Sequence, residues 1–232
     1  CIHAAANVFG VGGHKLHPHR ALLLNSKMDL NLVAALHDFP PEHMVYVGTV
    51  ASYGFPYQTQ PLRETHFLSG PPHESEYGYA MAKRFGFELA ESLSHQGTKV
   101  SRAVMTNLFG PHDNFNVETG HVVPSLIARA HSARQRQARL QVWGSPGDSR
   151  DFLYVDSAAA RILQLSKERH EGLVNIGSGI ERQITDVAEF VSSIFGLPGI
   201  ELIPGKANAV HRRVLDVQAL ERDFGKVEED FD

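Results

Sequence analysis

The chain contains 232 residues, and its 26 acidic side chains exceed 22 Lys and Arg side chains to give a formal net charge of −4. This length is enough to bury a substantial core in one domain with an added lobe. The weakly acidic balance predicts no nucleic-acid partner, and the apolar runs are too short to span a membrane. Cys1 is the single cysteine, which argues against an internal disulfide framework and favours a reducing, cytoplasmic location.

The apolar pattern predicts strands that alternate with helices along the first half of the chain. The expected elements are a strand at residues 1–6, a helix at 16–36, a strand at 43–50, a loop at 52–75, a helix at 78–96 and a strand at 100–108. This alternation favours an α/β fold with a partial Rossmann-like parallel sheet flanked by helices.

The pattern changes after residue 115. The expected elements are then a helix at 121–136, strands at 140–143 and 151–155, a helix at 156–167, a strand at 173–176, a helix at 185–195, and strands near 200–203 and 213–217. We predict a truncated Rossmann-type cofactor domain over residues 1–115. A smaller mixed α/β lobe for the substrate is expected over 116–232, in which about 151–180 return to the sheet.

Two side chains of the helix at 78–96 indicate proton chemistry. Tyr79 and Lys83 are four residues apart in the run YGYAMAK and therefore project from the same face. A nearby ammonium lowers the pKa of a phenol, so Tyr79 is predicted to exchange a proton near neutral pH. Thr49 adds a hydroxyl at the strand end, where open α/β sheets bind ligands. The alternative for the pair is an ordinary amphipathic helix, with one residue in the core and one in water.

Longer motifs follow in a set order. They are TNLFGPHDNF at residues 106–115, GHVVP at 120–124, WGS at 143–145 and RDFLYVD at 150–156. With Thr49, Tyr79 and Lys83 they resemble the GDP-L-fucose synthase family, within the extended short-chain dehydrogenase/reductases (NAD-dependent epimerase/dehydratases). The resemblance runs from Cys1 to about Phe224. It implies an enzyme that uses NADP(H), with NAD as the alternative, to epimerise and reduce GDP-4-keto-6-deoxymannose.

The amino-terminal part departs from the family pattern. Gly10 and Gly12 lie in a glycine-rich loop at residues 9–13, but Lys15 stands where a dinucleotide fingerprint has its third glycine. The family's glycine-rich turn and first three strands have no counterpart in these 232 residues, so we expect a fragment or a truncated member. The strand at 1–6 would then be an apolar edge that needs cover. NADPH binding by these residues alone is expected to be weak.

The resemblance assigns roles to matching residues. Tyr79 would protonate the C4 oxygen of the sugar as hydride arrives, Thr49 would hydrogen-bond the same oxygen, and Lys83 would hold the nicotinamide ribose. Asn107 would border the nicotinamide. Further cofactor contacts are expected from the end of the strand at 1–6, namely Ala4, Ala5, Ala6, Asn7 and Val8. The alternative for these small residues is a tightly packed strand end.

Epimerisation needs groups that move a carbon-bound proton. The family's histidine at the position of His121 does this, as an imidazole that titrates near neutral pH can. The alternative is a histidine at a helix start that bonds to backbone. The family also carries a cysteine two residues after the catalytic hydroxyl, where this chain has Ala51. A methyl group moves no proton, so we expect reduction to survive and epimerisation to be slow, partial or lost.

The resemblance places the diphosphate of the nucleotide sugar near Arg129, Arg150 and Arg213, since a guanidinium fork suits phosphate oxygens. Trp143 would pack on the sugar or base. The alternatives are a solvated surface charge, above all for Arg213, and a core position for Trp143. The expected partner is thus a small-molecule nucleotide sugar. A homodimer through the helices at 16–36 and 78–96 follows by analogy only.

Two further hypotheses remain. His14, His17 and His19 cluster locally, but no Cys or carboxylate recurs nearby, so we predict no metal site. The rival to the enzyme is a non-catalytic homologue that binds a sugar nucleotide but not NADP.

Overall fold

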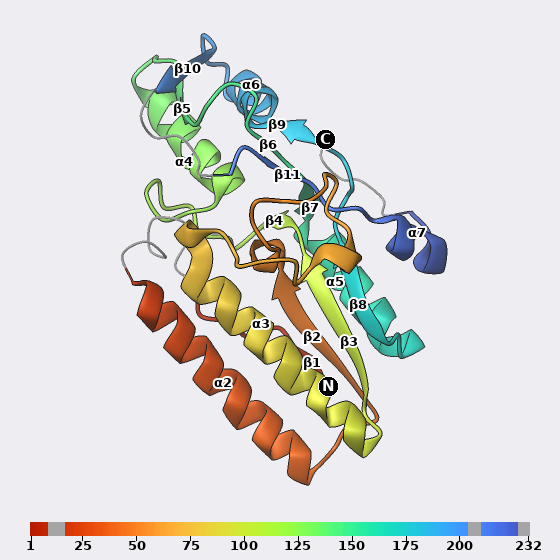
Figure 1. The fold of residues 1–232 in the computed structure, drawn as a ribbon. Coiled ribbons are helices and arrows are strands. Elements are labelled where there is room, and N and C mark those ends of the chain that lie inside the picture. The colour runs from red at the N-terminus through yellow and green to blue at the C-terminus, as the bar shows by residue number, and fades with distance from the viewer. Residues whose placement is uncertain (9–16, 204–209, 227–232) are drawn as a thin grey trace.

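The computed structural model describes residues 1–8, 17–203 and 210–226 (Figure 1). The glycine-rich loop at residues 9–13, with His14 and Lys15 after it, lies outside the described residues. Within the described part, each helix is too short or too polar to cross a membrane.

A four-stranded parallel sheet lies at the centre of the fold (Figure 1). Its order is β1 (Ile2–His3), β2 (His43–Thr49), β3 (Lys99–Met105) and β8 (Gly172–Ile176). Parallel strands are covered on both faces and therefore form apolar runs, which is how the sequence revealed β2, β3 and β8. The predicted α/β fold with a parallel sheet is confirmed.

Two strand predictions were wrong in length. The strand expected at 1–6 pairs with β2 only at Ile2–His3. The strand expected at 100–108 divides at Thr106. The Thr106 N–H still donates to the Ile176 carbonyl oxygen on β8, whereas the Asn107 N–H donates to the Asp151 carbonyl oxygen. Residues after Thr106 therefore form a separate strand, β4 (Asn107–Phe109), which pairs in parallel with β7 (Phe152–Tyr154). Hydrophobic periodicity carries no signal of such a change of partner.

Helices cover both faces of the sheet. On one face α2 (Pro18–Asp38) and α3 (Tyr77–Ser92) lie side by side, and α5 (Val155–Glu168) packs on the other (Figure 1). Pro18 occupies the first turn of α2, where its missing N–H costs no helix bond. Beyond α3 a 3₁₀ turn, Leu93–Gln96, ends at Gly97 with a φ of 85°. The predicted helices at 16–36, 78–96 and 156–167 are confirmed within a few residues at their ends.

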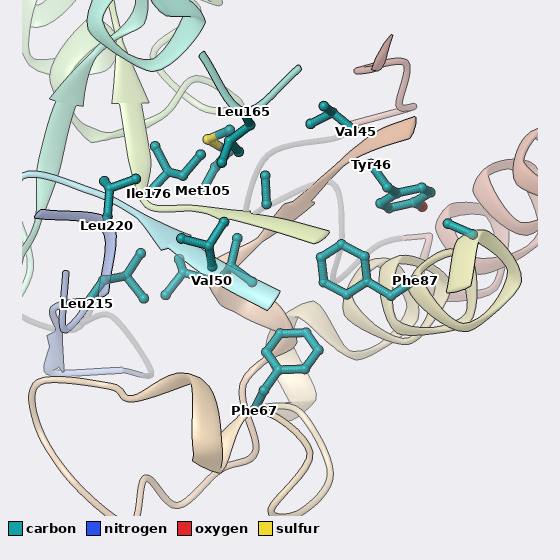
Figure 2. Packing of buried hydrophobic residues seen from close by; sticks show 14 of the residues in the cluster. Val45, Tyr46, Val50, Phe67, Phe87, Met105, Leu165, Ile176, Leu215 and Leu220 are labelled. Atoms are coloured by element: carbon teal, nitrogen blue, oxygen red, sulfur yellow. The ribbon is translucent and has the colours of Figure 1, made fainter. Parts of the chain in front are cut away.

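The main core lies between α3 and the sheet. Phe87 of α3 packs edge-on against Tyr46 of β2, with ring centroids 5.1 Å apart, and lies 5.4 Å from Phe67 (Figure 2). All three side chains are buried, and on the far side of the sheet Leu165 of α5 is buried too. This packing holds α3 against β2 and therefore sets the positions of the side chains in the first turns of α3, which include Tyr79 and Lys83.

Gly48 of β2 provides a test of this packing. A Cβ added at Gly48 would lie 2.2 Å from the Phe87 ring, a contact that forces the ring to move. We expect Gly48→Ala to lower the free energy of unfolding by about 1–3 kcal/mol, the usual cost of overpacking a core. Gly70→Ala is the control because a Cβ there meets no atom within 4 Å. Chemical denaturation of the two variants checks the prediction, and equal stability would contradict it.

A second hydrophobic cluster forms the smaller lobe. It joins α4 (Val122–Gln135) and α6 (Ile184–Ile194) to the parallel pair β5 (Leu140–Trp143) and β10 (Ile200–Ile203). These four elements match the sequence prediction closely. Short elements were missed: β6 (Ser149–Arg150), β9 (Arg182–Gln183) and α7 (Gln218–Phe224), while β11 (Arg212–Arg213) is shorter than expected. Two-residue strands have no period to detect, because neighbouring strands define them.

Candidate active site

Helix α3 carries Tyr79 and Lys83 toward the carboxyl end of β2. Lys83 is buried, with 2 % of its surface exposed, and its Nζ donates a hydrogen bond of 3.0 Å to the Val47 carbonyl oxygen. Val47 precedes Thr49 by two residues on β2. The Lys83 side chain therefore reaches from α3 to β2, two residues before Thr49. The amphipathic alternative does not hold, because Lys83 points into the protein and not into water.

A short turn after β2 holds Thr49 in place. The Thr49 Oγ1 accepts a hydrogen bond of 3.2 Å from the Ala51 N–H, which starts the 3₁₀ turn Val50–Ser52. Ser52 donates from its Oγ to the Ala80 carbonyl (3.3 Å), and Arg84 Nε donates to the Ser52 carbonyl (2.7 Å). Both bonds tie the turn to α3 beside Tyr79. The strand end and the helix thus supply Thr49, Tyr79 and Lys83 to one region.

Burial dominates the electrostatics of this region. It lowers the pKa of Lys83 to about 8, against an opposing effect of the Asp29 carboxylate. Burial also raises the pKa of Tyr79 above its ordinary value, with further contributions from Glu76 and Asp29. The expectation of a lowered Tyr79 pKa was therefore wrong, because burial of the phenol outweighs any effect of the Lys83 ammonium. Tyr79 is a neutral phenol at pH 7, which suits a proton donor.

The residues expected to meet the cofactor lie at the same edge of the sheet. Ala4 and Ala5 follow β1 and are exposed, Ala6 and Asn7 are half-buried, and Val8 is exposed. Asn7 is anchored, since its N–H donates to Asn25 Oδ1 of α2 (2.8 Å). Asn107 starts β4 and donates from Nδ2 to the Asp151 carbonyl (3.0 Å). Small, exposed side chains at Ala4 and Ala5 leave the backbone open to a flat ring, so these residues fit a nicotinamide nucleotide.

His121 precedes α4 in the smaller lobe. Its imidazole is exposed, and Nδ1 lies 3.4 Å from Asp113 Oδ1. The loop before it is folded by asparagine side chains, with Asn116 Oδ1 accepting from the Glu118 and Thr119 N–H groups. An exposed imidazole next to a carboxylate is accessible to a ligand. His121 makes no side-chain capping bond to the start of α4, and its acid/base role stays a prediction.

Arg129 and Trp143 form a stacked pair between α4 and β5. The guanidinium carbon lies 4.1 Å from the centroid of the Trp143 ring, and Arg129 also donates to Ser125 Oγ (2.7 Å) and the Gln141 carbonyl (3.1 Å). Both side chains are half-buried. Such a pair presents a flat, cationic surface for a sugar or phosphate.

Arg150 and Arg213 are buried and already bonded. Arg150 donates to the backbone carbonyls of Ser149, Val210 and His211, and burial lowers its pKa to about 10. Arg213 donates to Glu76 Oε2 at 2.5 Å and to the Tyr57 hydroxyl at 2.9 Å. The structure contradicts the surface-charge alternative for Arg213. Arg213 thus links β11 to the segments before α3, whereas Arg150 links β6 to the segment before β11, and the contact of both arginines with a diphosphate stays a prediction.

The described residues contain no group of three or more His, Cys, Asp or Glu side chains placed to bind a metal ion. His17 and His19 belong to this part, whereas His14 lies outside it.

Comparison with known proteins then identifies the fold family. The family model described as the NAD dependent epimerase/dehydratase family matches residues 1–177, which is more than half of the chain. The chain belongs to this family. The match includes Thr49, Tyr79, Lys83, His121 and Arg150, and Arg213 lies beyond it.

Among its relatives, the epimerase/dehydratase chain is similar to sugar-nucleotide enzymes. It is 31% identical over 230 residues to the GDP-L-fucose synthase of Escherichia coli strain K12, and 33% identical over 223 residues to that of Sinorhizobium fredii. Each alignment covers 94% of this chain and 71% of the relative. A crystal structure of a GDP-L-fucose synthetase from Naegleria fowleri bound to NADP superposes with a TM-score of 0.89 at 27% identity, covering 99% of this chain and 71% of that one.

Several residues of this family member escaped the sequence interpretation. Ser52 and Arg84 lock the turn after Thr49, Glu76 lies near Tyr79, and Asp29 of α2 reaches under the site. Asp29 was detectable in principle, since a carboxylate on the buried face of an amphipathic helix is unusual. Ser52 and Arg84 form bonds to backbone atoms across the fold, which no local pattern predicts.

Proposed function

We propose that this chain is an NADP(H)-dependent epimerase/reductase of a GDP-linked 4-keto-6-deoxy sugar. The observation that carries the proposal is the buried Lys83, which lies on the same helix as Tyr79 and bonds to the strand that ends in Thr49. This arrangement occurs in a chain about one third identical to GDP-L-fucose synthases.

Bound NADPH supplies the hydride for reduction, and the chain places the sugar and manages the proton. Thr49 would orient the C4 oxygen of the sugar by a hydrogen bond. Tyr79 would donate its phenolic proton to that oxygen, which requires the neutral phenol found here. The phenolate left behind is stabilised by the Lys83 ammonium, one helical turn away. Ala4, Ala5 and Asn107 would border the nicotinamide.

The lobe would hold the rest of the substrate. The stacked Arg129 and Trp143 present a face to the sugar or the diphosphate, and Arg150 and Arg213 complete the proposed binding set.

The proposal includes a cytoplasmic homodimer through α2 and α3, whose exposed apolar residues include Leu23, Leu30 and Phe85. Light scattering at several concentrations tests that assembly.

The reductase proposal is tested by NADPH oxidation in the presence of GDP-4-keto-6-deoxymannose. We expect turnover with this sugar nucleotide and none with GDP-mannose, which lacks a keto group to accept hydride. Sugar-nucleotide binding without NADPH oxidation at any coenzyme concentration would contradict the reductase and favour the non-catalytic alternative.

Epimerisation should be weak in this protein. Ala51 is buried in the turn after Thr49 and offers no proton-transfer group, so His121 would have to serve both C3 and C5. In deuterated water without NADPH, we expect slow or partial deuterium uptake into GDP-4-keto-6-deoxymannose, and His121→Asn should reduce it by about 10²–10⁴-fold. His112→Asn is the control, since His112 lies in the same loop and is also exposed. Rapid uptake at both carbons by the unaltered protein would show that Ala51 is immaterial.

A further inference from the structure

A buried carboxylate lies beneath the proposed active site. Asp29 belongs to α2, and 1 % of its surface is exposed. Its Oδ2 accepts a hydrogen bond of 2.6 Å from the Tyr46 hydroxyl, and its Oδ1 lies 2.7 Å from His3 Nε2, which donates to it. Three elements, β1, β2 and α2, therefore supply one polar network inside an apolar layer. A buried carboxylate of this kind is costly unless it has partners, so its presence calls for a reason.

The network extends to Lys83 through the Tyr46 ring. Lys83 Nζ lies 4.9 Å from the centroid of that ring, within the range of a cation–π contact. Tyr46 lies between β2 and the helices, beside Phe87 (Figure 2). A phenol that donates to a carboxylate has a more electron-rich ring, so the Asp29 bond strengthens the attraction between Tyr46 and the ammonium.

Close packing holds this arrangement. A Cβ at Gly86 would lie 1.9 Å from the Tyr46 hydroxyl oxygen and 2.4 Å from Asp29 Oδ2. Gly86 follows Lys83 on α3 by three residues, so α3 contacts the network directly. The glycine allows the backbone of α3 to approach the carboxylate, and no water-sized gap separates them.

We propose that Asp29 is a positioning residue, whose carboxylate, held by His3 and Tyr46, keeps the buried Lys83 ammonium charged and in place beside Tyr79. This inference rests on the proposed function for its catalytic meaning, but the charge state of Lys83 can be measured without the reaction. It assigns a task to three buried residues that the reductase chemistry itself does not use.

The charges around Lys83 support this task. Burial drives the pKa of Lys83 down to about 8, and Asp29 acts in the opposite direction. The groups that face Lys83 are Tyr46 from β2 and Asp29 from α2, with His3 of β1 behind Asp29. On α3 itself Tyr79 lies one turn away, and Glu76, the residue just before α3, lies about two turns away. Because the ammonium is the active form, activity should fall as pH rises past the Lys83 pKa, and losing Asp29 should move that fall to lower pH.

The test is a direct titration of Lys83 by NMR of its ¹³Cε resonance in the complete protein, assigned by its loss in Lys83→Arg. Asp29→Asn removes the charge and keeps an oxygen that can accept from Tyr46. We expect the Lys83 titration midpoint to fall by about one pH unit. The alkaline limb of kcat should shift equally, with little change in KM for the sugar nucleotide. The control is Asp38→Asn, at the exposed end of the same helix.

Tyr46→Phe is the second variant, and it keeps the inference testable if Asp29→Asn does not fold. Without the hydroxyl the ring is less electron-rich. The titration midpoint of Lys83 in Tyr46→Phe should therefore lie below that of the unaltered protein, but the decrease should be smaller than in Asp29→Asn. An unchanged Lys83 midpoint in either folded variant would overturn the inference. A shifted midpoint in a protein without reductase activity would support the inference and contradict the proposed function, so the two failures are distinguishable.

Discussion

Replacement of Tyr79 by phenylalanine should slow reduction of the keto sugar by about 10²–10⁴-fold, the usual contribution of a positioned proton donor. An ordinary phenol is already neutral at pH 7, and burial, Glu76 and Asp29 raise the pKa of Tyr79 further, so the proton is available when the C4 oxygen becomes negative. A phenyl ring fills the same space but donates nothing. The affinity for the sugar nucleotide should change little. The loss should therefore appear in the rate constant for NADPH oxidation measured in a single turnover.

Tyr77→Phe provides a matched control. Tyr77 starts the same helix two residues earlier, and 45 % of its surface is exposed. The side chains of Tyr77 and Tyr79 point in different directions, because residues two apart on a helix do not share a face. Rates within about twofold of the unaltered protein are expected for this variant. Equal losses in both variants would show that the proton comes from another group.

Replacement of Lys83 by methionine should abolish most reduction and yet stabilise the fold. A pKa of about 8 against an ordinary value of 10.5 corresponds to about 3 kcal/mol of native-state penalty for the charged lysine below pH 8. Methionine avoids this penalty but leaves the Val47 carbonyl without its lysine donor, a loss of about 1 kcal/mol. The free energy of unfolding at pH 7 should therefore rise by about 2 kcal/mol, while kcat falls by about 10²–10³-fold.

The pH dependence of this gain fixes its cause. Between pH 8 and the ordinary lysine value, the unfolded chain binds more protons than the native chain, so the stability of the unaltered protein rises with pH. The advantage of Lys83→Met should therefore shrink between pH 8 and pH 10. Lys27→Met on the exposed face of α2 is the control and should show no such trend. A clear decrease in stability for Lys83→Met at pH 7 would mean that the ammonium is better solvated than its burial indicates.

Local patterns predicted the elements that carry the site. The four-residue spacing of Tyr79 and Lys83 fixed their common face, and the apolar run before Thr49 fixed the strand end. These features depend on helix and strand geometry alone, which is why the sequence sufficed. The division of the chain at Thr106 depends on partners far along the chain and could not be found in this way.

Burial and contacts across the fold decided what the sequence missed. The sequence suggested that Lys83 would lower the Tyr79 pKa, but burial of the phenol raises it, with further contributions from Glu76 and from Asp29, which lies fifty residues before Tyr79. The contact of Arg150 and Arg213 with a diphosphate stays a prediction, but the sequence did not show that their guanidinium groups bond to backbone carbonyls, Tyr57 and Glu76. A sequence lists charged residues, whereas only the packed fold decides which of them meet.

Hydride transfer to the sugar tests the central claim most directly. The protein is incubated with GDP-4-keto-6-deoxymannose and excess NADPH that carries deuterium at the transferable position, and NMR locates the label. We predict deuterium on C4 of a 6-deoxyhexose product, and loss of that label in Tyr79→Phe. Recovery of unlabelled keto sugar at saturating NADPH, after prolonged incubation, would contradict the claim that this chain is a sugar-nucleotide reductase.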